Sequence, residues 1–245
     1  LPWSDVFLLA GAAQIVCLLL VYFTIPKKLP EQSNRSDRHP LDFRPVFQNR
    51  TALAYIWGYT GHTYELFAYR AWIVAFLLFA AGASGTAVSR ETVAGCAALF
   101  SLLGMPASLI GAHISLRRDR RQTISVVMVL SVIAGVTLGF IGALPFVFVL
   151  LLAGLYSVFI MSDSAALTGG VVAAAREGER GATLATHSVL GFSGGFLGPL
   201  VVGLVLDAGA GPESIVGWGS AYIATAAGSG VALIGIRWLL RHQRF

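Results

Sequence analysis

Residues 123–142 read TISVVMVLSVIAGVTLGFIG and contain no charged side chain. A helix needs roughly 20 apolar residues to cross the hydrocarbon core of a bilayer. The apolar residues do not alternate with polar ones as they would in a membrane strand with one wet face. A backbone surrounded by lipid must also satisfy its own hydrogen bonds, which a helix does. The stretch therefore predicts a transmembrane helix.

The rest of the chain has the same apolar character. Hydrophobic residues make up 56% of the 245 residues, and mean hydropathy is +0.75. Charged residues make up 12%, about half of the roughly 25% that is typical of soluble domains. Seven blocks are long enough to span a bilayer, at roughly 3–25, 53–81, 92–116, 123–142, 145–172, 182–206 and 215–237. The sequence predicts an all-α membrane protein with seven transmembrane helices.

The basic residues give these spans a direction. All Lys and Arg residues except Arg70 and Arg90 fall in the segment 26–50, the loops 117–122 and 173–181, or the C-terminus. An even number of spans separates each of these segments from the next, so all of them lie on the same side of the membrane. The positive-inside rule places that side in the cytoplasm. We expect a multi-pass protein of the cell membrane, with a prokaryotic inner membrane preferred, the N-terminus of this chain outside and its C-terminus inside. The net charge of +5 does not indicate nucleic-acid binding, because it lies in short loops.

Segment 26–50 is the only long loop, and it is rich in Pro, Asp, Arg, Ser and Asn. It has no helical apolar period, so it predicts a polar linker with one span before it and six after it. The alternative is an ordinary cytoplasmic loop without meaning for domains.

Three local patterns add to this topology. The first is Gly111–Arg121, GAHISLRRDRR, whose candidate motif residues are Gly111, Arg117, Arg118, Asp119, Arg120 and Arg121. The second is GFSGGFLGP, whose Gly191/Gly195 and Gly194/Gly198 spacings let helices approach closely and whose Pro199 favours a bend. The third is YTGHTYELFAYRAW at 59–72. For the first two, a plain basic loop and simple close packing without gating are the alternatives.

Together the topology and patterns resemble the second half of a major facilitator superfamily transporter. Gly111–Arg121 is similar to the family's basic loop motif, with Ser115 in place of its Asp, and 191–199 is similar to its Gly-Pro helix motif. The resemblance implies that 1–25 is the last helix of a missing N-terminal bundle. It makes 26–50 the cytoplasmic linker and 51–245 a C-terminal six-helix bundle of 3+3 inverted repeats. It also implies alternating access, with the third and sixth spans of the bundle, 123–142 and 215–237, facing lipid.

Ionisable side chains inside the spans are the candidates for a substrate and proton pathway, because each costs several kcal/mol in lipid unless it faces a cavity or a partner. His62, Glu65 and Tyr69 lie on one helical face, and we expect Glu65 to face the central cavity and to couple transport to protons. An interhelical hydrogen bond or structural ion pair is the other interpretation of Glu65. The remaining pathway candidates are Arg70, Asp163 and His187.

Asp163 and His187 fall in neighbouring spans, where they would form a gate or proton relay, or only a satisfied hydrogen bond. Arg70 would contact an anionic solute or extend to the outer surface. The resemblance implies secondary transport of a small solute, driven by a proton or solute gradient. Glu65 favours proton coupling, as in a symporter, and Arg70 favours a small anion as the solute.

Other classes fit less well. A retinal protein needs a lysine in its last span, and the only lysines are Lys27 and Lys28. A non-retinal seven-helix receptor and a half-size protein acting as a homodimer remain alternatives. An intramembrane aspartyl protease needs two aspartates, and Asp163 is the only one within the core of a span. We expect no enzyme activity and no cofactor or metal, since the chain has two cysteines and no nucleotide-binding motif.

Overall fold

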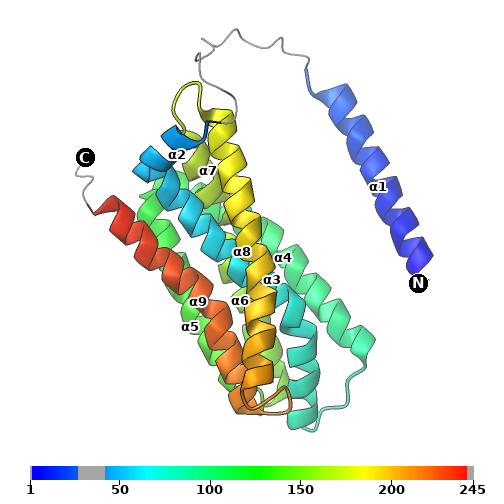
Figure 1. Cartoon of the computed structure of the whole chain (residues 1–245). Coiled ribbons are helices and arrows are strands. Elements are labelled where there is room, and N and C mark those ends of the chain that lie inside the picture. The colour runs from blue at the N-terminus through cyan, green and yellow to red at the C-terminus, as the bar shows by residue number, and fades with distance from the viewer. Residues whose placement is uncertain (1, 27–41, 242–245) are drawn as a thin grey trace. The chain divides into compact units, whose positions relative to one another are not determined.

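The computed structural model describes residues 2–26 and 42–241 (Figure 1). Within these residues the elements are α1 (Trp3–Thr24), α2 (Arg44–Gln48), α3 (Arg50–Ala83), α4 (Arg90–Arg117), α5 (Arg120–Phe140), α6 (Phe146–Ser162), α7 (Ser164–Ala174), α8 (Arg180–Ala208) and α9 (Ile215–Leu240). Helix α1 forms one unit, and α2 to α9 form another.

Seven spans in the described part of the chain have the length and apolar composition needed to cross a membrane: α1, α3, α4, α5, the pair α6 and α7, α8, and α9. Polar side chains at the loop boundaries set where several of them begin. Asn49 accepts a hydrogen bond from the backbone N–H of Ala52 at 3.1 Å to start α3. Asp119 accepts one from Gln122 at 2.7 Å to start α5. Such caps satisfy backbone donors that a first helical turn leaves free. The predicted all-α membrane fold is confirmed.

Two local features differ from the sequence prediction. The segment 26–50 ends in the short helix α2, where Pro45 supplies a first-turn residue without an N–H and Val46 is buried. The linker prediction otherwise concerns residues 27–41, which lie outside the described residues. The span predicted at 145–172 is two helices, α6 and α7, which meet at Asp163. Its backbone N–H donates to the carbonyl of Met161.

Helix α3 is the centre of the bundle of residues 42–241, and it packs against α4, α6, α7, α8 and α9. The remaining pairs follow a repeat. The contact of α4 with α6 corresponds to the contact of α8 with α3. In the same way, the contact of α5 with α6 corresponds to the contact of α9 with α3. Helices α5 and α9 also pack on each other. This is the set of neighbours that two related groups of three spans produce, the first being α3 to α5 and the second α6 to α9.

Glycines let the central helices approach closely. A Cβ on Gly194 or Gly198 of α8 would meet the backbone carbonyl of Thr60 or Tyr64 on α3. A Cβ on Gly61 would meet the carbonyl of Gly228 on α9. Side chains cannot be inserted at these points without moving a backbone, so glycine is required for this spacing.

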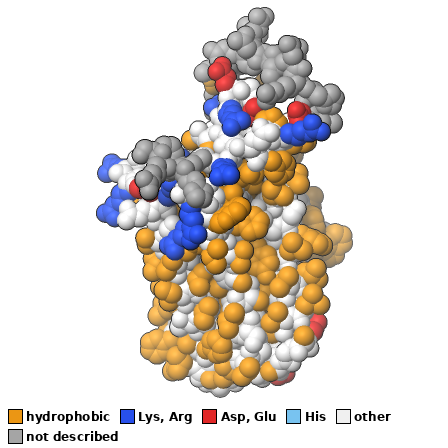
Figure 2. Space-filling view, turned by 60° about the vertical axis from the view of Figure 1, so that its left-hand side comes forward, with side chains coloured by type: hydrophobic (Ala, Val, Ile, Leu, Met, Phe, Trp, Pro, Cys, Tyr) orange, Lys and Arg blue, Asp and Glu red, His pale blue; other side chains and the backbone are white. Residues whose placement is uncertain are grey.

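Charge and apolar surface are separated along the bundle. Arginines gather at one end, and apolar side chains cover most of the face shown in Figure 2. Helices α5 and α9 each have an exposed apolar side, which includes Ile133 at 58% and Ile234 at 71% exposure. Neither is the central helix, and lipid contact along these sides stays a prediction.

Candidate functional site: a buried polar cluster on the central helix

Glu65 lies in the interior of the bundle and is 1% exposed. Its Oε1 accepts hydrogen bonds from Tyr156 Oη at 2.7 Å and Ser131 Oγ at 3.0 Å. Its Oε2 accepts a short hydrogen bond from Ser229 Oγ. The three donors come from α6, α5 and α9, so α3 and three further helices meet at one carboxyl group. An ionised carboxylate only accepts hydrogen bonds, which suits a shell made of O–H donors.

The carboxyl group also lies deep in the bundle. Glu65 is close to the middle of α3, Ser131 is close to the middle of α5, and Ser229 is close to the middle of α9. Three spans that cross the same bilayer bring their midpoints to similar depth. Water is scarce at this depth, and the hydroxyl donors replace part of the hydration that the carboxylate loses on burial.

A second polar pair lies one helical turn from Glu65. His62 Nδ1 is 2.8 Å from Asp163 Oδ1, and the two side chains are 2% and 3% exposed. Within the described residues neither atom has a further hydrogen-bond partner. Asp163 lies at the junction of α6 and α7, so this contact joins the central helix α3 to that junction.

Aromatic rings connect His62 to His187. The Tyr59 ring lies 5.6 Å from the imidazole of His62 and 4.0 Å from that of His187, between centroids. His187 is 6% exposed, and its Nδ1 has no hydrogen-bond partner in the part of the chain that the structure describes. The buried side chains of Glu65, His62, Asp163 and His187 therefore form one cluster on and around α3.

These positions change how the candidates are grouped. The carboxyl group of Glu65 is enclosed by α5, α6 and α9, with the interhelical hydrogen bonds of the other interpretation, and contact with a central cavity between two bundles stays a prediction. His62 contacts Asp163, and Asp163 does not pair with His187. Glu65 and His62 have different neighbours because residues three apart in a helix point in directions that differ by about 60° around its axis.

Tyr69 and Arg70 lie apart from the cluster. Tyr69 is 3% exposed and donates from its Oη to the carbonyl of Ala153 at 2.9 Å, with its ring edge-on to Tyr156. It therefore supports the residue that holds Glu65. Arg70 is exposed on α3. It makes no hydrogen bond or ion pair with another described residue.

The glycine candidates of α8 all lie against α3. Gly191 and Gly195 face the rings of Tyr59 and Phe67, while Gly194 and Gly198 face backbone carbonyls. Pro199 lies inside α8, which continues through it, and its carbonyl accepts a hydrogen bond from Trp72 Nε1 at 3.0 Å. This is close packing, and gating by Pro199 stays a prediction.

The candidates of the basic loop motif serve different structural roles. A Cβ on Gly111 would meet the Ser162 carbonyl, so α4 approaches the α6–α7 junction most closely there. Asp119 caps α5. Arg117 and Arg118 are exposed at the end of α4, whereas Arg120 and Arg121 are half-buried at the start of α5.

The sequence reading missed the three hydroxyl donors. Ser131 and Ser229 fall in spans without an internal ionisable residue, and Tyr156 lies in an apolar run. The available signal was the central position of each polar side chain in its span. It is weak, because serines in membrane helices often bond only to their own backbone.

The comparison with known proteins agrees with this arrangement of spans. No curated protein and no solved structure matches the chain. The model of the Major Facilitator Superfamily matches residues 1–199. This range includes α1, the central helix α3, the carboxyl groups of Glu65 and Asp163, and the glycines of α8 up to Pro199. The chain belongs to the major facilitator superfamily, a family of membrane transporters.

Proposed function

We propose that the bundle is part of a proton-coupled secondary transporter, in which Glu65 takes up and releases the coupling proton. The observation that carries this proposal is a carboxyl group at mid-depth whose hydroxyl donors come from three separate helices. A leucine at this position would avoid the cost of burying a carboxyl group.

Protonation of Glu65 changes what its neighbours can do. The protonated acid is itself an O–H donor, so one of the hydroxyls of Ser131, Tyr156 or Ser229 must turn from donor to acceptor or move away. The packing of α5, α6 and α9 around α3 thus responds to a single proton. His62, Asp163 and His187 offer a path toward the end of the bundle where the arginines gather, which we propose is cytoplasmic.

Alternating access needs a second bundle opposite this one. We propose that an N-terminal bundle, of which α1 is the last helix, completes the cavity, with residues 26–50 as the cytoplasmic linker. The solute class that we favour is a small anion, and the motivating observation is that Arg70 is exposed and has no ion-pair partner among the described residues. On this proposal the transporter is a symporter of a cell membrane, preferably a prokaryotic inner membrane.

The test is gradient-driven uptake by the intact transporter in proteoliposomes, first with a panel of radiolabelled small organic and inorganic anions. For the solute that accumulates, Glu65→Gln should abolish accumulation against a gradient while leaving solute exchange largely intact. Glu91→Gln, which changes an exposed carboxylate at the start of α4, is the control. Wild-type accumulation by Glu65→Gln would refute the proposal, and loss of function in Arg90→Gln equal to that in Arg70→Gln would refute the anion contact.

A further inference from the structure

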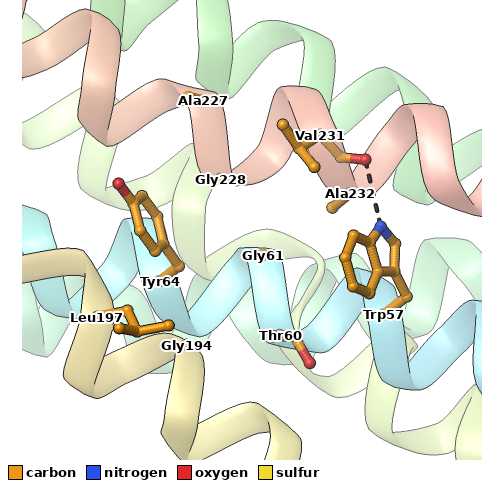
Figure 3. A pocket seen from close by; sticks show the side chains of 10 residues that line it. All are labelled: Trp57, Thr60, Gly61, Tyr64, Gly194, Leu197, Ala227, Gly228, Val231 and Ala232. Atoms are coloured by element: carbon orange, nitrogen blue, oxygen red, sulfur yellow. Dashed lines mark hydrogen bonds between the residues drawn. The ribbon is translucent and has the colours of Figure 1, made fainter. Parts of the chain in front are cut away.

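A groove runs along the outside of the bundle between α8 and α9, with α3 as its floor. Its inner part, farthest from Arg50, has a volume of about 290 Å³ and is lined by Trp57, Thr60, Gly61, Tyr64, Gly194, Leu197, Ala227, Gly228, Val231 and Ala232 (Figure 3). Figure 3 shows Trp57 and Tyr64 rising from α3 on either side of Gly61. Trp57 Nε1 donates to the Val231 carbonyl at 3.2 Å, which fixes this ring against α9.

The groove continues toward the basic end of the bundle. A second part of about 380 Å³ shares Trp57 with the first and extends to Leu239. A third part of about 280 Å³ shares four residues with the second and adds Arg50. Because the three parts share lining residues, they form one groove along the surface, which begins at Arg50 and ends at Tyr64.

The two ends of this groove differ in chemistry. Arg50 is exposed at the start of α3 and makes no ion pair or hydrogen bond with any other residue that the structure describes. Phe47 and Trp238 beside it are 56% and 68% exposed, and aromatic rings are typical of the membrane interface. Arg241 lies three residues beyond Trp238, on the same side of α9. Farther along, apart from Thr60 and Tyr64, the lining is apolar or glycine.

The length of the groove matches one leaflet. Fourteen residues of helix, from Arg50 to Tyr64, rise roughly 21 Å, which is about half of the roughly 40–45 Å that a bilayer measures with its headgroup regions included. A ligand with a negative head at Arg50 and an apolar tail would therefore lie from the interface to the bilayer midplane.

We propose that this groove binds an anionic phospholipid, with its phosphate on Arg50 and one acyl chain between α8 and α9. The basic end of the bundle is the predicted cytoplasmic side, and anionic lipids are enriched in that leaflet. The inner end of the acyl chain lies against Tyr64, the residue before Glu65. A bound acyl chain there restricts the separation of α8 and α9, which both pack on the central helix α3.

The test is native mass spectrometry of the delipidated 245-residue chain, titrated with dioleoyl phosphatidylglycerol or dioleoyl phosphatidylcholine. The wild-type chain should bind the anionic lipid more tightly. Arg50→Gln should weaken phosphatidylglycerol binding by about fivefold and leave phosphatidylcholine unchanged. Arg176→Gln, which removes an exposed charge from the α7–α8 loop at the same end, should keep the wild-type preference.

A second variant tests the acyl part of the site. Ala227→Phe should weaken the binding of both lipids because the ring fills the groove, whereas Ala98→Phe, on an exposed position of α4, should not. An unchanged lipid preference in Arg50→Gln would overturn the proposal, as would wild-type binding of both lipids by Ala227→Phe. A chain dimer that Ala227→Phe abolishes would assign the groove to a second copy and also overturn it. If Ala227→Phe does not elute as a folded monomer, Arg50→Gln decides alone.

Discussion

At the scale of the residue, Glu65 shows how a single acid reports on the packing around it. Its donors are Ser131, Tyr156 and Ser229, and each belongs to a different helix. Removing one donor leaves the other two in place, so the effect of each hydroxyl on proton binding can be measured separately.

Infrared difference spectroscopy of the purified chain after a pH jump should show the carbonyl band of a protonated carboxylic acid. Glu65→Gln should remove this band, because the amide cannot titrate. Ser229→Ala should shift its frequency, since the carbonyl loses one hydrogen-bond donor. The same band in Glu65→Gln as in the wild type would show that another acid titrates, and Glu91→Gln should leave the band of Glu65 in place.

His62 and Asp163 are both buried, and their side chains are in contact with each other. His62→Ala leaves a buried carboxyl group without a partner, and Asp163→Ala leaves a buried imidazole nitrogen without one. Each change should lower the free energy of unfolding by about 1–3 kcal/mol, with the larger loss in His62→Ala because an isolated carboxylate costs more to bury.

The double variant should lose less than the two single variants combined, by a coupling of about 0.5–3 kcal/mol. Unfolding by detergent titration, followed by circular dichroism, measures all four proteins of this cycle. Strict additivity would show that the 2.8 Å contact contributes nothing to stability.

At the scale of the helix, the closest packing depends on positions that have no side chain. Gly194→Ala should lower the free energy of unfolding by about 1–3 kcal/mol, because its Cβ would meet the Thr60 carbonyl. Gly95→Ala in α4 is the matched control, since a Cβ there has nothing within 4 Å. It should stabilise the helix by up to about 1 kcal/mol. Equal effects of the two changes would contradict the packing described for α3 and α8.

The helices could be predicted from sequence far better than their rotation. An uncharged apolar run such as 123–142 has no alternative in a membrane, because its backbone must bond to itself. The side on which Glu65 points depends on which neighbours offer hydroxyl groups, and Ser229 is 164 residues away. The junction at Asp163 was also missed, because Ser162, Asp163 and Ser164 include neither proline nor glycine.

At the scale of the whole molecule, the separation of basic and apolar surface predicts the orientation of the chain in the membrane. In a chain with Cys17 and Cys96 replaced by alanine, a cysteine at exposed Glu213 should react with a membrane-impermeant maleimide in intact cells. A cysteine at exposed Glu177 should react only after the cells are permeabilised, because Arg176 and Arg180 mark the cytoplasmic side. Labelling of position 177 from outside would reverse the topology.

The junction at Asp163 also has a consequence for the timescales on which the bundle moves. Helix α7 has 11 residues, and a helix this short is marginal without its neighbours. Because its hydrogen-bond ladder starts afresh beyond Asp163, it can open without unwinding α6. Amide hydrogens of Ser164–Ala174 should therefore exchange with deuterium faster than those of Phe146–Ser162. Helix α7 would then be the part of this span that opens first in local unfolding.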